Sequence, residues 1–92
     1  MSIPSYKKLC NPIIQALHER GGSAPVRELE KAVADMLHLS KAERNEKRAD
    51  GKTRLGYRIA WARYYLKRQG ILARVKPGTC SLSEKGKRTF SV

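Results

Sequence analysis

The sequence predicts a small, mainly α-helical domain that carries one short β-hairpin. Two segments in the first forty residues repeat apolar residues at the spacing of an α-helix, and a third follows between residues 55 and 69. After Gly70 the pattern changes to that of two short strands around a Lys-Pro-Gly turn. Because the chain has 92 residues, of which 40% are hydrophobic, we expect one domain over residues 1–92 with a single modest core.

The first helix is predicted from about residue 4 or 5 to residue 20. Its apolar stripe consists of Tyr6, Leu9, Ile13, Ala16 and Leu17, flanked by Cys10 and Ile14. Pro12 lies inside this segment and removes one helical hydrogen bond, so we expect either a kink or a later start. Gly21-Gly22 ends the helix, because glycine adopts left-handed backbone conformations readily.

The second helix is predicted to begin at Pro25, after Ser23-Ala24 as a short connection. Its apolar stripe consists of Leu29, Ala32, Val33, Met36 and Leu37. Ser40 and Glu43 then match a capping box, which predicts a short helical turn. Residues 45–53 contain no bulky apolar residue and include a turn-forming Asp-Gly pair, so we expect a basic, mobile loop there.

The third helix is predicted from about Leu55 to Gln69, with Gly70 as its C-terminal stop. Its core stripe consists of Leu55, Ile59, Ala62 and Leu66. Tyr65, at the edge of this stripe, and Tyr6 of the first helix are assigned to the core. Because the first two helices cannot bury their stripes alone, both must pack against the third.

A hairpin is predicted after the third helix, with strands at residues 71–75 and 79–82. Lys76-Pro77-Gly78 joins them in a type II turn, in which the glycine takes a positive φ. Ser83 and Glu84 cap a final helical turn that ends near Phe90. The order of three helices followed by a hairpin is that of a winged helix-turn-helix.

Positive charge is concentrated in the second half of the chain. Residues 1–40 carry five Lys and Arg against four Asp and Glu, whereas residues 41–92 carry fifteen against four. The net charge of +12 is therefore divided into +1 and +11. Solvated surfaces usually mix both signs, while one-signed charge on half of a small domain is typical of proteins with polyanionic partners. We therefore favour nucleic acid as the partner over an uncommitted basic surface.

The third helix leaves a face of alternating aromatic and basic residues once its core stripe points inward. With about 100° of rotation per residue, the outward arc consists of Arg54, Tyr57, Ala60, Trp61, Tyr64 and Arg68. Arginine binds guanine edges or phosphates, tyrosine hydroxyls reach phosphates, and aromatic faces contact pyrimidine methyl groups. The helix N-terminus and the hairpin tip are both placed to meet phosphates. The candidate DNA-binding residues are Lys52, Thr53, Arg54, Tyr57, Arg58, Trp61, Tyr64, Arg68, Arg74 and Lys76.

Within this set, the N-terminal half of the helix is expected in the major groove. The base-edge candidates are Arg54, Tyr57, Arg58 and Trp61, and the backbone candidates are Tyr64 and Arg68. For Trp61 we favour packing over DNA contact, because a lone tryptophan in a small domain usually packs. Arg58 has two interpretations, a base contact or an ion pair with a second-helix carboxylate, Glu28 or Glu30.

The sequence offers no support for catalysis, a metal or a cofactor. It contains no paired carboxylates on an apolar background, no nucleophile elbow and no glycine-rich phosphate loop. Cys10 and Cys80 lie far apart without CxxC spacing, so neither a disulfide framework nor a zinc site is expected. No apolar run reaches the roughly 18 residues of a membrane span, and no secretory signal is present. We expect a non-enzymatic, cytoplasmic chain with no membrane partner.

Several segments match a known family in order along nearly the whole chain. They are Pro4-x-Tyr6 with Pro12 and Leu17, the pattern over residues 32–40, Arg58-Ile59-Ala60-Trp61-Ala62, Leu66-Lys67-Arg68-x-Gly70-Ile71-Leu72 and Leu82-Ser83-Glu84-x-Gly86. The most specific part is Arg-x-x-Trp-Ala followed by Leu-Lys-Arg-x-Gly. Together these segments resemble the N-terminal domain of Mrr-type restriction endonucleases.

This resemblance implies a winged-helix DNA-binding module that normally precedes a PD-(D/E)XK-type nuclease domain acting on modified, typically cytosine-methylated, DNA. It also implies that the long segment between the second and third helices is normal for the family. The chain stops at Val92, where the nuclease domain would begin. We therefore expect an excised domain or a standalone relative, without cleavage activity.

The leading hypothesis is a module that binds double-stranded DNA, with or without a preference for methylated bases. The third helix then occupies the major groove and the wing contacts the backbone. Two alternatives stay open: a protein-interaction or homodimerisation module, and an RNA or single-strand binder that stacks bases on the aromatic residues. Homodimerisation and covalent linkage to a nuclease domain in a longer protein are the further partnerships considered.

Overall fold

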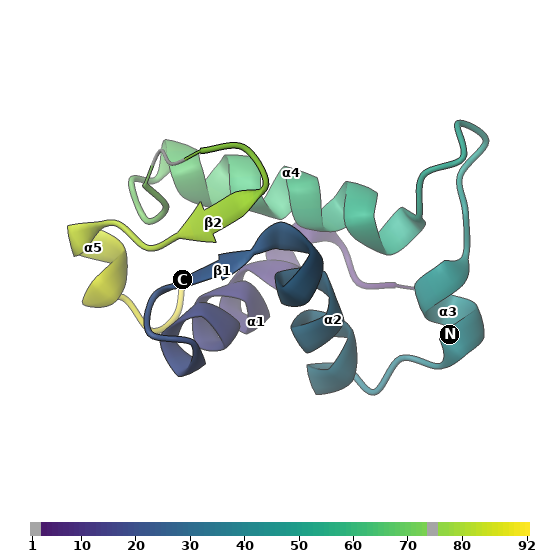
Figure 1. The fold of residues 1–92 in the computed structure, drawn as a ribbon, viewed down its shortest axis with the longest axis horizontal. Coiled ribbons are helices and arrows are strands. Elements are labelled where there is room, and N and C mark those ends of the chain that lie inside the picture. The colour runs from purple at the N-terminus through teal and green to yellow at the C-terminus, as the bar shows by residue number, and fades with distance from the viewer. Residues whose placement is uncertain (1–2, 74–75) are drawn as a thin grey trace.

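The computed structural model describes residues 3–73 and 76–92. The helices span Tyr6–Glu19 (α1), Val26–Met36 (α2), Lys41–Asn45 (α3), Arg54–Arg68 (α4) and Glu84–Lys87 (α5), and the strands span Ser23–Pro25 (β1) and Thr79–Ser81 (β2). Helix α4 runs across the molecule, and the two strands lie beside its C-terminal half (Figure 1). This mainly α-helical fold with a small antiparallel sheet confirms the predicted fold class and is consistent with a winged helix.

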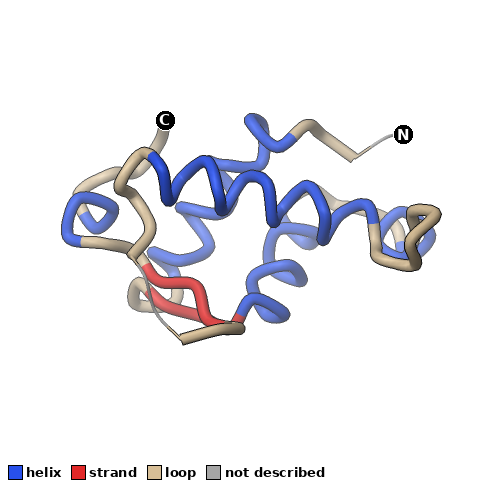
Figure 2. The backbone as a smooth tube through the Cα atoms, turned by 90° about the horizontal axis from the view of Figure 1, so that it is seen from above, coloured by secondary structure: helices blue, strands red, loops and turns tan. Residues whose placement is uncertain are grey.

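The core lies where α1, α2 and α4 meet (Figure 2). Most residues of the predicted apolar stripes are buried in it. The largest fully buried side chains are Leu9, Cys10, Ile13, Ile14, Leu17, Leu29, Val33, Ile59 and Leu66. Tyr6 and Tyr65 pack at the edge of this core, with ring centroids 6.0 Å apart. Because each buried Leu or Ile contributes about 1.5–3 kcal/mol, the core fixes one face of α4 and leaves the opposite face exposed.

Helix α1 continues through Pro12, so a later start of this helix is wrong. Proline has no N–H to donate to the carbonyl of Lys8, and the remaining helical bonds and the buried stripe maintain the helix. The helix ends where predicted, because Gly21 and Gly22 have φ of 77° and 99°. The Gly22 N–H donates to the Leu17 carbonyl at 2.7 Å, which satisfies one of the free carbonyls of the last turn.

The two-stranded sheet pairs different segments from those predicted. Strand β2 is antiparallel to β1, with the register Ser23–Ser81, Ala24–Cys80 and Pro25–Thr79. Ala24 and Cys80 are both buried and join the core from neighbouring strands. Pro25 has no backbone N–H to donate. It suits the last position of β1, because a residue at the end of a strand does not have to donate a hydrogen bond within the sheet. The segment expected as a connection between the first two helices is therefore half of the sheet.

The predicted hairpin after α4 is present in part. Leu72 and Leu82 form an antiparallel bridge within the described residues, instead of a longer strand pair. The turn between them has the expected form, because the Thr79 N–H donates to the Lys76 carbonyl at 3.3 Å. Gly78 has a φ of 83°, as the third residue of a type II turn requires.

The segment between α2 and α4 contains more regular structure than the expected loop. The predicted capping box is present, since the Ser40 hydroxyl accepts from the Glu43 N–H at 3.1 Å and the Glu43 carboxylate accepts from the Ser40 N–H at 2.8 Å. Lys47 and Thr53 then form an antiparallel bridge. This small turn brings Thr53 to the N-terminus of α4.

The C-terminal segment is held against α1 by side chains of that helix. The His18 Nε2 atom lies 2.7 Å from the carbonyl oxygen of Thr89, and its ring stacks on Phe90 with centroids 4.3 Å apart. The Asn11 carboxamide oxygen accepts from the N–H of Val92 at 2.7 Å. Residues after α5 therefore follow the outer face of α1.

Replacing Gly86 by alanine is expected to destabilise the fold by about 1–3 kcal/mol. A Cβ on this buried residue of α5 would lie 2.1 Å from the backbone oxygen of Ile71. Backbone at that position cannot move aside as a flexible side chain can, so the overlap outweighs the gain in helix propensity of about 1 kcal/mol. Urea unfolding of Gly86→Ala beside Lys87→Ala, an exposed change on the same helix, measures the effect. Equal stabilities would contradict the close approach.

Candidate nucleic-acid interface

Helix α4 presents three aromatic side chains to solvent. The core covers the face with Ile59 and Leu66, and the opposite face carries Tyr57, Trp61 and Tyr64, which are 38%, 47% and 51% exposed. These three residues follow one another at spacings of four and three, which places them side by side on the helix surface. We call them the aromatic row. Because Trp61 is exposed, its interpretation as a buried packing residue is wrong.

The rings of the aromatic row stand at steep angles to one another. The Trp61 ring lies 6.3 Å from Tyr57 at 77° and 5.9 Å from Tyr64 at 88°. A cation flanks each end, since the Arg48 guanidinium lies 3.6 Å over the Tyr57 ring and that of Arg68 lies 5.8 Å from the Tyr64 ring. A hollow of about 420 Å³ beside the row is lined by Lys52, Tyr57, Ala60, Trp61 and Tyr64. The predicted arc residues Tyr57, Ala60, Trp61, Tyr64 and Arg68 are therefore brought together.

Two predicted site residues at the start of α4 already have partners. Thr53 is the N-cap, and its hydroxyl accepts from the Gly56 N–H at 3.0 Å. The Arg54 Nε atom lies 2.8 Å from the Glu46 carboxylate, with both side chains about half exposed. An exposed ion pair of this kind contributes about 0–1 kcal/mol. Arg54 can therefore exchange this carboxylate for another anion at little expense in stability.

Arg58 has a different partner from those expected. Its half-buried guanidinium donates to the backbone carbonyls of Ile3 and Pro4, the latter at 3.4 Å, and so holds the segment before α1 against α4. Glu28 instead pairs with Arg20 at 3.2 Å. The ion pair of Arg58 with Glu28 or Glu30 is therefore wrong, and Arg58 is occupied by contacts within the fold.

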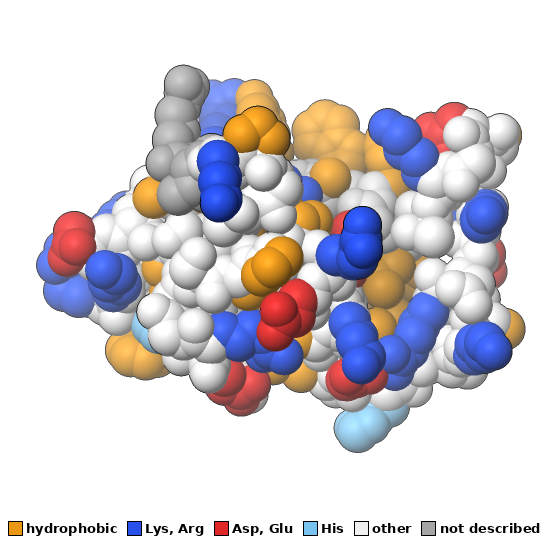
Figure 3. Space-filling view, in the orientation of Figure 1, with side chains coloured by type: hydrophobic (Ala, Val, Ile, Leu, Met, Phe, Trp, Pro, Cys, Tyr) orange, Lys and Arg blue, Asp and Glu red, His pale blue; other side chains and the backbone are white. Residues whose placement is uncertain are grey.

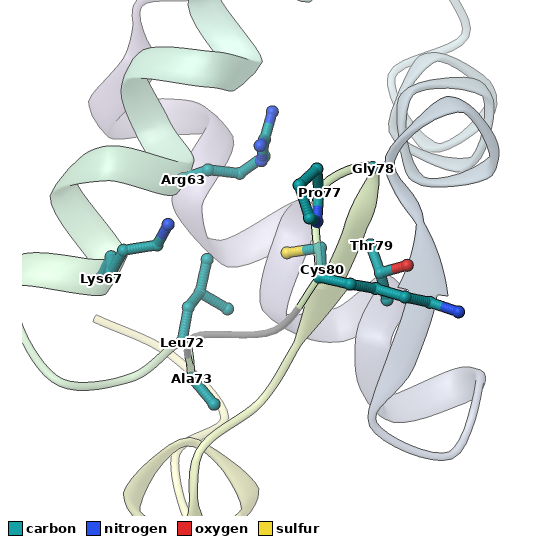
Figure 4. A pocket seen from close by; sticks show the side chains of 9 residues that line it. Arg63, Lys67, Leu72, Ala73, Pro77, Gly78, Thr79 and Cys80 are labelled. Carbon is teal, nitrogen blue, oxygen red and sulfur yellow. The ribbon is translucent and has the colours of Figure 1, made fainter.

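The turn before β2 approaches α4 on a flank that the sequence prediction missed. Lys76 lines a cavity together with Arg63 and Lys67, which project from α4 toward the strand that carries Cys80 (Figure 4). On a helical projection the two α4 residues lie between the core stripe and the outward arc, so they were assigned to neither. The candidate residue Arg74 lies outside the described residues.

Acidic side chains pair with several basic residues up to the first residue of α4, but with none of the later basic residues of this helix among the described ion pairs. The pairs of 2.7–3.2 Å are Arg20–Glu28, Arg44–Asp35, Arg48–Asp50 and Arg54–Glu46. By contrast, residues 51–83, which contain α4 and the turn before β2, include no Asp or Glu. On the face with α2, α3 and the strands, Lys and Arg side chains outnumber the scattered acidic ones (Figure 3). The stretch that contains α4 and the turn before β2 therefore carries positive charge with no acidic residue of its own.

Within residues 3–73 and 76–92, no three His, Cys, Asp or Glu side chains gather in a group that could hold a metal ion. None of the helices in the same ranges is long and apolar enough to cross a membrane. Cys10 and Cys80 are buried free thiols, and burial raises the pKa of both. Raised pKa values keep these thiols protonated near neutral pH.

Residues 6–91 match the family model of the Mrr N-terminal domain. The chain belongs to this family. This Mrr N-terminal domain is 29% identical over 86 residues to the type IV methyl-directed restriction enzyme EcoKMrr of Escherichia coli (strain K12). The alignment covers 94% of the domain but 28% of the enzyme, so the chain spans little more than a quarter of that relative's length. No solved structure matches the chain.

The segments that carry the resemblance have identifiable positions in this Mrr N-terminal domain. In the Arg-x-x-Trp-Ala segment, Arg58 holds the N-terminal segment, Trp61 is exposed and Ala62 is buried. In the following segment Leu66 is fully buried, and Gly70 ends α4 with a φ of 78°. Arg58, Ala62, Leu66 and Gly70 therefore build the fold, whereas the fold leaves Trp61, Lys67 and Arg68 exposed on the surface.

Proposed function

We propose that this Mrr N-terminal domain binds double-stranded DNA, with α4 in the major groove and the turn before β2 on the phosphate backbone. The observation that carries the proposal is the aromatic row on an exposed helix face flanked by basic residues. A helix with its side chains is about 10–12 Å wide, which matches a major groove of about 12 Å. The exposed face of α4 is therefore of the right shape and charge for a duplex.

The individual contacts follow from the position of each side chain along α4. Tyr57 and Trp61, in the N-terminal and central turns, are assigned to base edges, and Arg54 joins them on exchanging Glu46 for DNA. Tyr64 and Arg68, near the C-terminal end, are assigned to the backbone. The other residues that we assign to the DNA backbone are Lys52, Arg74 and Lys76. Thr53 and Arg58 act indirectly, by fixing the start and the position of α4.

The geometry of the aromatic row favours a duplex over a single strand. Proteins that hold single strands stack successive bases on aromatic faces. In the row, the Trp61 ring stands at 77° and 88° to its two neighbours, so the three rings do not form a continuous platform of parallel faces on which successive bases could stack. Edges and hydroxyl groups of this kind suit the methyl groups and polar edges of a base-pair stack.

The family relationship supports a place for this domain in DNA restriction. EcoKMrr is named as a methyl-directed restriction enzyme, and this chain aligns with about a quarter of it. We infer that the domain supplies DNA recognition in such a protein and that cleavage belongs to the remainder. The exposed aromatic faces suit an apolar contact to a methyl group on a pyrimidine, which supports a preference for methylated DNA.

Salt-titrated binding to labelled duplexes, methylated and unmethylated, and to the matching single strand tests the proposal. With about six to eight phosphates neutralised, the plot of log K against log salt should have a slope of about −5 to −7. We expect the duplexes to compete with each other and to displace the single strand. Duplex affinity that is indifferent to salt would contradict the proposal, and tighter binding of the single strand would favour the stacking alternative.

A further inference from the structure

A small cavity separates α4 from the turn that precedes β2 (Figure 4). It has a volume of about 90 Å³, and its lining residues are Arg63, Lys67, Leu72, Ala73, Lys76, Pro77, Gly78, Thr79 and Cys80. Arg63 and Lys67 are one helical turn apart on α4, and Lys76 comes from the opposite wall. Three cationic side chains from two separate segments therefore line one cavity.

The charge in this cavity is largely uncompensated by the protein. Among the described residues, Arg63, Lys67 and Lys76 form no salt bridge, whereas Arg48 and Arg54 each do. Glu30 of α2 interacts electrostatically with Arg63. Burial raises the pKa of the Glu30 carboxyl, and the positive charge of Arg63 opposes this rise. The other titratable group is the Cys80 thiol, whose pKa is raised by burial and lowered in part by the two α4 cations. The carboxylate of Glu30 therefore interacts with Arg63, but Glu30 does not belong to the lining of the cavity.

The position of the cavity relative to the aromatic row suggests which anion fills it. Arg63 follows Trp61 by two residues, so it points to a different side of α4, toward the strands. A helix in the major groove has the phosphates of one strand along each of its sides. Cations on the side of α4 that faces the strands therefore lie where one row of phosphates passes.

We propose that Arg63, Lys67 and Lys76 form a binding site for one phosphate of the DNA backbone, on the strand that borders the groove beside β2. This site rests on the proposed function and adds two residues of α4 to the contacts assigned above. Lys67 and Lys76 are exposed and Arg63 is half-buried, so a phosphate in solvent has access to all three side chains. Phosphate contacts of this kind set the position of a protein on the duplex.

The test compares charge-matched double variants in salt-titrated duplex binding. The variant Arg63→Gln/Lys67→Gln removes two cations from the cavity, and Lys8→Gln/Arg88→Gln removes one lysine and one arginine from exposed positions outside its lining. The cavity variant should lower the affinity about 10-fold or more and reduce the magnitude of the salt slope by about 1. The control pair should leave the salt slope near that of the unmodified chain.

A second variant, Lys67→Gln/Lys76→Gln, changes two exposed side chains and keeps the test valid if loss of Arg63 disturbs the fold. It should reduce the slope by the same amount, with unchanged circular dichroism. Unmodified slopes in both cavity variants, in a chain that does bind duplex DNA, would overturn the site and leave the proposed function intact. Absence of salt-dependent duplex binding by the unmodified chain would overturn the proposed function, and the site with it.

Discussion

The variant Trp61→Ala is expected to bind duplex DNA about 30-fold more weakly than the unmodified chain. Trp61 lies at the centre of the aromatic row and is 47% exposed, so truncation removes a large apolar surface from the middle of the proposed interface. Central tryptophans are among the residues whose loss weakens binding by about 2 kcal/mol or more. The same side chain is not part of the buried core, so the stability of the chain should change little.

Fluorescence anisotropy of a labelled duplex measures this loss, and urea unfolding checks the fold. Phe90→Ala is a matched control, because it removes another exposed aromatic ring, which is 70% exposed and stacks on His18 of α1. Trp61→Phe keeps an aromatic ring, so its duplex affinity should lie between those of Trp61→Ala and Phe90→Ala. An equal loss in Trp61→Ala and Phe90→Ala would show that the aromatic row is not the contact.

Replacing Ile59 by alanine is expected to destabilise the chain by about 2–5 kcal/mol. Ile59 is fully buried on the face of α4 that packs against α1 and α2. Truncation removes the burial of three carbons and leaves a cavity that neighbouring helices fill only in part. A domain of this size has a stability of roughly 5–14 kcal/mol, so this single change removes a large share of it.

Urea unfolding measures the effect, with Ala60→Ser as the control one residue away. Ala60 is exposed, so its substitution should change stability by less than about 0.5 kcal/mol. The milder Ile59→Val should cost about 0.5–1.5 kcal/mol. If Ile59→Ala were as stable as Ala60→Ser, the placement of α4 against α1 and α2 would be wrong.

Local sequence patterns were sufficient to predict the helices and the exposed arc of α4. The apolar stripes of α1, α2 and α4 are buried as their periodicity requires, because each stripe is long enough to define a face. The capping box at Ser40 depends on neighbouring residues alone and was also predicted. Once Ile59 points inward, helical rotation alone places Tyr57 and Tyr64 outside.

Features that depend on distant segments could not be read from the sequence. Three residues of β1 are too few to show a strand period, and their pairing with β2 joins segments more than fifty residues apart. The bond from Arg58 to the Ile3 carbonyl and the approach of Arg63 to the turn before β2 have the same origin. The packing prediction for Trp61 was wrong for another reason. A lone tryptophan in a small domain usually packs, but the exposure of Trp61 depends on which elements cover α4.

The separation of charge along the chain has a simple structural basis. Before α4, basic residues such as Arg44 and Arg48 have acidic partners within 2.7–2.8 Å. From residue 51 to residue 83 no acidic residue is available, and the fold places this stretch along α4 and β2. Residues 51–83 carry eight Lys and Arg and no acidic residue, so this stretch supplies +8 of the net charge of +12.

Intrinsic tryptophan fluorescence tests the central claim, that the exposed face of α4 is the duplex-binding surface. The chain contains a single tryptophan, so its emission reports on Trp61 alone. Titration with an unlabelled duplex should quench or shift this emission with the same affinity as anisotropy reports, and added salt should reverse both changes together. Duplex binding seen by anisotropy with an unchanged Trp61 emission would contradict the assignment of α4 as the DNA-binding helix.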